Sequence, residues 1–152
     1  MRIAAIAAGL FLSLTGFAVA QSYDTPQALI EAVYAPYIKD EIPEDDEHFR
    51  SAALQALYDH DAEITPEGEM GAIEFDPFIN GQDYEITELE IGEPQIEGDR
   101  AVIEVTFNNF DEANSLTYEL VNEDGWKIDD VSSEMGEYPY RLSEIFAAAS
   151  AD

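Results

Sequence analysis

The stretch "AVIEVTFNNFDEANSLTYEL", Ala101 to Leu120, decides the fold. Apolar side chains occupy every second position from Ala101 to Phe107 and again from Leu116 to Leu120. A period of two is that of a β-strand with one buried face. The segment 111–113 between the two runs is short enough for a hairpin. The stretch therefore predicts two antiparallel strands.

Two more strands are predicted on either side of this hairpin. Trp126 and Ile128 continue the period of two, and the apolar residues of segment 86–91 do so with a phase slip that indicates a β-bulge. The short segments 97–99 and 123–125 connect these strands to the hairpin. Four consecutive strands with short connections predict an antiparallel meander.

The sequence before the strands predicts a helix that begins at Thr25 and Pro26. A threonine oxygen can accept from the free amides of a first turn, and proline suits the first helical position. Apolar residues then recur at four-residue spacing as far as Tyr37. Pro36 lies inside this pattern and is expected to kink or end the helix near Ala35.

A second helix is predicted from Glu44 to Asp59, with an acidic first turn that suits the helix dipole, and a short third helix from about Tyr140 to Ala149. Residues 61–83 have no sustained period and predict a long connection. The predicted fold is α+β, with both N-terminal helices on one surface of a curved four-stranded antiparallel sheet. A curved sheet of this kind encloses a cone-shaped cavity beneath the helices.

The first 20 residues predict a cleaved secretory signal peptide. Arg2 precedes an apolar run, and the small residues Ala18 and Ala20 stand where a signal peptidase requires them. Residues 21–152 are then expected to form a single exported domain, periplasmic or secreted, without a membrane anchor after cleavage. The chain has no cysteine, which excludes disulfides and a lipid-bearing cysteine at the cleavage site.

The chain is strongly acidic, with 34 Asp and Glu residues against six Lys and Arg residues and a net charge of −28. A negative field repels nucleic acids and anionic lipid headgroups, so neither is expected as a partner. Three explanations of the charge remain open at this point. It can keep an exported protein soluble, attract a basic partner or bind cations.

The residues that resemble a known family are the loop "DPFINGQDY", Asp76 to Tyr84, and the closing strand "GWKIDDV", Gly125 to Val131. Together with the order of elements, these motifs resemble the bacterial envelope proteins grouped as domain of unknown function 3828. The resemblance spans residues 25–131 and implies a cystatin-like fold related to nuclear transport factor 2. It implies no activity, because none is established for that family. Some relatives are lipoproteins, whereas this chain lacks the cysteine.

Asp76, Asn80 and Asp83 in the first of these motifs are candidate ligand-binding residues. Loop carboxylates beside a cavity are common binding groups, and these three are expected near the mouth of the cone. The alternative interpretation is structural, since Asp76 and Asn80 favour turns while Phe78 and Ile79 can anchor the loop in the core.

Asp130 is the fourth candidate. It continues the apolar phase of Trp126 and Ile128, which predicts an inward side chain that can act as an acid or base. Asp129 is then expected on the opposite face. The alternative is that the strand frays there and Asp130 faces water or caps a turn.

No metal site or cofactor is predicted. The segment "YDHDAE" around His60 invites comparison with a calcium loop, but the positions that require Gly and Glu are Ile64 and Met70. With two histidines and no cysteine, a zinc site is not expected either. His60 is interpreted as a solvated residue at a helix end.

Three classes of function are compatible with the sequence. The first is a noncatalytic exported domain that binds a small ligand or an envelope protein, with a basic protein as one kind of partner. The second is a small hydrolase, isomerase or dehydratase that uses the inward carboxylate Asp130 with a tyrosine or His60. The third is an acidic inhibitor or immunity-type protein that masks a basic enzyme. Oligomeric state is not predicted.

Overall fold

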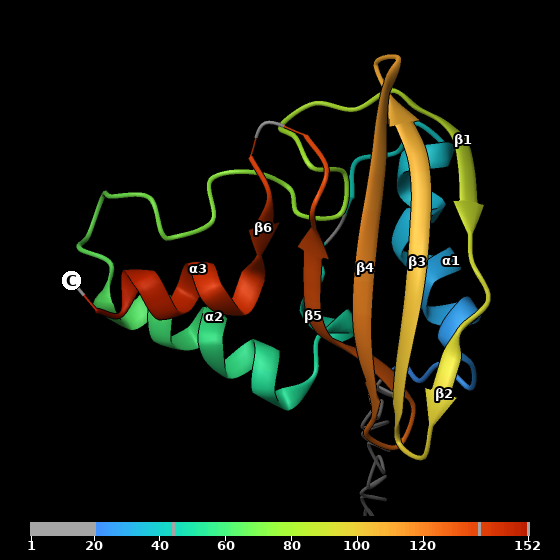
Figure 1. Cartoon of the computed structure of the whole chain (residues 1–152). Coiled ribbons are helices and arrows are strands. Elements are labelled where there is room, and N and C mark those ends of the chain that lie inside the picture. The colour runs from blue at the N-terminus through green and yellow to red at the C-terminus, as the bar shows by residue number, and fades with distance from the viewer. Residues whose placement is uncertain (1–20, 44, 137, 152) are drawn as a thin grey trace, which may run out of the picture.

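The computed structural model describes residues 21–43, 45–136 and 138–151 (Figure 1). The predicted signal peptide, residues 1–20, lies outside the described residues. Within them the fold is α+β, with three α-helices and an antiparallel sheet of six strands in the order β1-β3-β4-β5-β6, in which β2 also pairs with β3. The prediction of an α+β fold is confirmed, but the sheet has six strands where four were predicted.

The hairpin predicted from Ala101 to Leu120 forms the centre of the sheet. Strands β3 (Arg100–Asn109) and β4 (Glu112–Asn122) pair in one continuous register from Arg100↔Val121 to Asn109↔Glu112. Phe110 and Asp111 make the two-residue turn between them, and both have positive φ. A turn of this kind matches the right-handed twist of the paired strands.

Two short strands, β1 and β2, pair with β3 one after the other and form one edge of the sheet, with a break between them. β1 (Ile86–Ile91) and β2 (Gln95–Glu97) pair with opposite halves of β3. At the break, a side chain on Gly92 would place its Cβ only 2.8 Å from the carbonyl oxygen of Glu104, so glycine is required there. The predicted bulge is confirmed, since the register shifts between Thr87 and Glu90.

The other edge carries an unpredicted strand. β5 (Trp126–Ser133) pairs with β4, and the two-residue β6 (Tyr140–Arg141) pairs with β5. The third helix, α3 (Leu142–Ala149), follows at once. The helix predicted to begin at about Tyr140 therefore begins two residues later, because residues 140–141 bond to the sheet.

Helix α1 (Pro26–Ile38) lies against β1 and β5 and covers one face of the sheet. Its predicted start is confirmed, because the Thr25 hydroxyl accepts from the Ala28 amide at 3.1 Å. Pro36 was expected to kink or end the helix near Ala35, and the helix does not end there but continues to Ile38. The buried Tyr37 is bonded through its hydroxyl to Asp76, and this contact holds the last turn in place.

The second helix differs from its prediction at both ends. Its predicted start, Glu44, lies outside the described residues; a 3₁₀ turn, η1 (Glu47–Phe49), precedes α2 (Ala52–Ile64). The main chain of Ser51 donates to Ile128 on β5 at 2.7 Å, and its hydroxyl caps α2 by accepting from Leu54 at 3.0 Å. The chain is therefore bonded to the sheet at the point where a continuous helix was expected.

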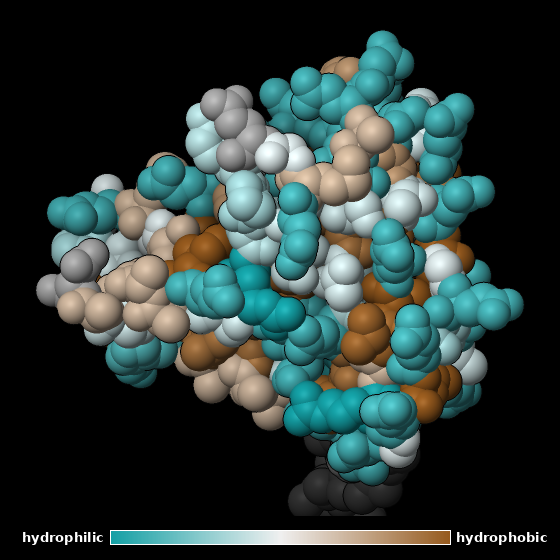
Figure 2. All heavy atoms as spheres, viewed as in Figure 1, coloured by the Kyte–Doolittle hydropathy of each residue, from teal (hydrophilic) through white to brown (hydrophobic). Residues whose placement is uncertain are grey.

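Helices α2 and α3 pack against each other beside β5, whereas α1 lies behind β3 and next to β1 in Figure 1. Both N-terminal helices contact β5 and contribute buried side chains to one hydrophobic core. Polar and apolar side chains are interspersed over the face of the molecule that Figure 2 presents. No helix among the described residues has the length and apolar composition that a membrane crossing requires.

Candidate functional site

The loop 76–81 is a closed corner. The Asp76 amide donates to the Gly81 carbonyl at 2.8 Å, and the Gly81 amide donates back to Asp76 at 3.3 Å. Asn80 adopts the positive φ that such a turn uses. Phe78 and Ile79 are only 5% and 1% exposed, so both apolar side chains of the loop lie in the core.

Tyrosine hydroxyls hold this corner against α1 and the sheet. Tyr34 donates to the carbonyl of Phe78 at 2.9 Å and lies 2.9 Å from the hydroxyl of Tyr118. Tyr37 donates to one Asp76 oxygen, while the other accepts from the Phe78 amide at 2.9 Å. Burial raises the pKa of Asp76 above its usual value, against the opposing effect of these two bonds.

The structure places Asn80 and Asp83 in different surroundings. Asn80 donates to the Asn114 side chain at 3.1 Å and lines a hollow of about 600 Å³ between this loop and α3. Asp83 has an exposed side chain, and its main-chain carbonyl accepts from Asn109 at 3.1 Å. The two residues are not brought together at the mouth of one cavity.

Asp130 is buried, but on the other face of the sheet from Ile128. Ile128 pairs with Leu120, whereas Asp130 pairs with the next residue of β4, Glu119, so Asp129 is an extra residue in β5. Neighbours along a strand point to opposite faces, and the extra residue reverses the phase. The prediction that Asp130 shares the face of Trp126 and Ile128 is wrong for this reason.

The Asp130 carboxylate binds the start of α3. One oxygen accepts from the amides of Val131 at 2.9 Å and Ser143 at 3.2 Å. The other accepts from Arg141 at 2.8 Å and from the Ser143 hydroxyl at 2.6 Å. Both oxygens are occupied by donors of the protein, which fits a helix cap better than a catalytic acid or base. His60 is exposed on α2.

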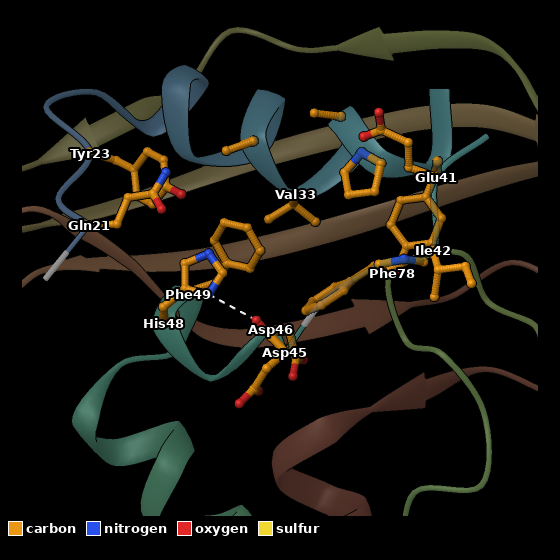
Figure 3. A pocket seen from close by; sticks show the side chains of 15 residues that line it. Gln21, Tyr23, Val33, Glu41, Ile42, Asp45, Asp46, His48, Phe49 and Phe78 are labelled. Carbon is orange, nitrogen blue, oxygen red and sulfur yellow. Dashed lines mark hydrogen bonds between the residues drawn. The ribbon is translucent and has the colours of Figure 1, made fainter. Parts of the chain in front are cut away.

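A pocket of about 500 Å³ lies beside α1, and sequence reasoning did not identify it (Figure 3). We call it the α1 pocket. Its apolar and aromatic walls are Tyr23, Val33, Tyr37, Phe49 and Phe78. Figure 3 shows Phe49 and Phe78 on either side of Val33, with Asp45 and Asp46 beside the gap between the rings.

Carboxylates surround the opening of the α1 pocket. Glu41, Asp45 and Asp46 are lining residues. Asp46 forms an ion pair with Arg50, and Asp45 accepts from the Glu47 amide at 2.9 Å. Glu41 forms no ion pair in the part of the chain that the structure describes. The pocket therefore combines aromatic walls with a negative rim.

Phe49 connects this pocket to the sheet. Its ring lies 5.8 Å from that of Tyr23 and 3.9 Å from that of His48. The carbonyl of His48 accepts from the Lys127 ammonium at 2.6 Å, and the carbonyl of Tyr23 accepts from the Trp126 amide at 2.8 Å. These bonds hold the segment of Tyr23 and the segment of His48 and Phe49 to the start of β5. The rings of Tyr23 and Phe49 meet there.

Two crystal structures share this fold. A chain of the type VI effector-immunity complex Tae3-Tai3 from Ralstonia pickettii, in its selenomethionine form, matches with a TM-score of 0.52 and 19% identity, over 75% of this chain and 100% of that chain. A chain of the native complex matches with a TM-score of 0.51 and 20% identity, over 78% and 99%. At these identities the likeness concerns the fold alone. No family model and no curated protein matches the chain.

Proposed function

We propose that this chain is a noncatalytic, acidic protein of the inhibitor or immunity type, which binds a basic protein. The observation that carries the proposal is the match to the whole length of a chain from an effector-immunity complex. The net charge of −28 supports it, because complementary charge steers a basic partner towards the surface.

The candidate residues favour this proposal over the small enzyme. The Asp130 oxygens are occupied by Arg141, Ser143 and main-chain amides, and Asp76 is bonded within its own corner. A general acid or base must reach its substrate through a hydrogen bond. Neither carboxylate is free to do so in this arrangement.

The proposal predicts retention of one basic protein on the immobilised folded chain, residues 21–152. An extract of the source cells would be passed over the chain and over poly-glutamate as a control for charge alone. We expect the retained protein to elute between about 0.05 M and about 0.5 M NaCl, since salt screens the attraction. Its purified form should lose its own activity when mixed with an equimolar amount of the chain.

Two results would contradict this prediction. The same proteins retained by the chain and by poly-glutamate would mean that the charge acts without specific recognition. A specific partner whose activity is unchanged by the chain would remove the inhibitor or immunity assignment. The second result would leave a binding protein for a ligand or an envelope protein.

We also propose that the protein is exported and acts in the periplasm or outside the cell, as a relative of the envelope family that its motifs resemble. Cleavage after Ala20 should produce an N-terminus at Gln21, either free or cyclised. Mass spectrometry of the intact protein from the envelope fraction measures this directly. A mature protein that retains Met1 would contradict both the signal peptide and the location.

A further inference from the structure

We infer that the α1 pocket receives a cationic side chain, arginine or lysine, from the basic partner. This inference rests on the proposed function and names the point of contact within it. Two features of the pocket favour this occupant, its aromatic walls and the carboxylates at its opening.

The walls suit an organic cation. A guanidinium or ammonium group is attracted to the face of an aromatic ring within about 6 Å of its centroid. Tyr23 and Phe49 have centroids 5.8 Å apart with an interplanar angle of 32°, and Phe78 lies on the other side of Val33 from Phe49. The apolar stem of arginine or lysine can pack on Val33 while its charged end remains at the rim.

The carboxylates at the opening differ in whether a cation of the protein neutralises them. Two cations that contact lining residues of the pocket are already bound, Arg50 by Asp46 and Lys127 by the carbonyls of Gln21 and His48. Arg50 also lies 3.6 Å from the centre of the Tyr58 ring, away from the pocket. Glu41 and Asp45 are left as carboxylates without an ion pair among the described residues.

A buried hydroxyl in the wall offers a further polar contact to an occupant of the pocket. The Tyr23 hydroxyl is buried and lies beside the Gln21 side chain, with which it interacts without forming a well-aligned hydrogen bond. Tyr23 is 7% exposed and lines the pocket. Burial raises the pKa of Tyr23, which the nearby Gln21 side chain opposes only in part. A buried polar group of this kind is normally satisfied, and a guanidinium or ammonium donor entering the pocket would satisfy it.

The test is a binding assay with the captured partner that compares two variants of the pocket, one filled and one with less rim charge, with matched controls. Ala32→Phe fills the pocket from α1 without removing a core side chain, and Ala53→Phe adds the same ring to an exposed position of α2. The double variant Glu41→Gln with Asp45→Asn removes the two rim charges that have no ion pair among the described residues, and it keeps an oxygen for the Glu47 amide. Glu31→Gln with Glu63→Gln removes the same charge from exposed positions elsewhere.

Both pocket variants should bind the partner at least about tenfold more weakly than their controls, as truncation of a central interface contact does. Equal binding by pocket and control variants would overturn this inference while the proposed function stands. Failure of the unmodified chain to retain any specific basic protein would instead contradict the proposed function.

A second measurement tests the chemistry of the occupant without the partner. The peptide acetyl-Gly-Arg-Gly-amide should shift the NMR signals of Tyr23 and Phe49, and acetyl-Gly-Gln-Gly-amide should not. Ala32→Phe should abolish the shifts. Tetramethylammonium or spermidine would be titrated alongside. Micromolar binding of either small cation would overturn the assignment to a protein side chain and identify a small-molecule site instead.

Discussion

Trp126→Ala is expected to lower the free energy of unfolding by roughly 3–5 kcal/mol, as for other buried aromatic residues. Trp126 is 5% exposed and belongs to the hydrophobic core, at the first position of β5. Removing the indole leaves a cavity that the surrounding main chain cannot fill, because the Trp126 amide is bonded to Tyr23 at 2.8 Å. Such a loss approaches the whole stability of a typical domain, about 5–15 kcal/mol.

Urea unfolding followed by circular dichroism measures this change. Phe110→Ala is the matched control, since Phe110 is also aromatic but is 53% exposed at the β3–β4 turn. The control should change the free energy of unfolding by less than about 1 kcal/mol. A similarly small change for Trp126→Ala would mean that its ring does not contribute to the core.

The elements that the sequence predicted correctly depend on local patterns. Strands β3 and β4 follow from a period of two over many residues, and the start of α1 follows from Thr25 and Pro26. The bulge in β1 follows from a phase slip within six residues. Each pattern lies within a single element, so no knowledge of the rest of the chain was needed.

The errors occur where distant contacts decide the local structure. α1 passes Pro36 because Tyr37 bonds to Asp76, and α2 starts late because Ser51 bonds to Ile128. β6 exists only because two residues before α3 reach β5. In each case the partner is at least seven residues away, and no local pattern indicates it.

In the candidate site too, features set by local patterns were predicted and features set by distant contacts were not. The sequence identified Asp76 and Asn80 as turn residues, and they form a turn, but it also placed Asp130 on the wrong face. One extra residue in β5 reverses a phase that Trp126 and Ile128 had set. The α1 pocket was missed altogether, because its walls come from α1, η1, the loop at Phe78 and the segment before α1. The only signal in the sequence was the run of acids before His48 and Phe49.

Phe78→Ala is expected to destabilise the fold by roughly 3–5 kcal/mol, which is of the same order as the Trp126 change. The Phe78 ring is 5% exposed and stacks on Tyr118 with centroids 6.2 Å apart. Its loss also loosens the carbonyl of Phe78, to which the buried Tyr34 hydroxyl donates. A buried hydroxyl that loses its partner adds to the cost of the cavity. Thermal unfolding should show a large fall in Tm.

The variant Asp76→Asn distinguishes between a structural role and a binding role of the loop 76–81. Asparagine keeps an oxygen for the Phe78 amide and offers its NH₂ group to the Tyr37 hydroxyl, so the corner should remain folded. The pKa of Asp76 is raised in the folded state, so the folded protein holds this proton more tightly than the unfolded chain. The wild type should therefore gain stability relative to Asp76→Asn as the pH falls from about 7 towards about 4. If Phe78→Ala is instead as stable as the wild type and Asp76→Asn abolishes partner binding, this corner is a recognition site and its aromatic ring contributes little to the core.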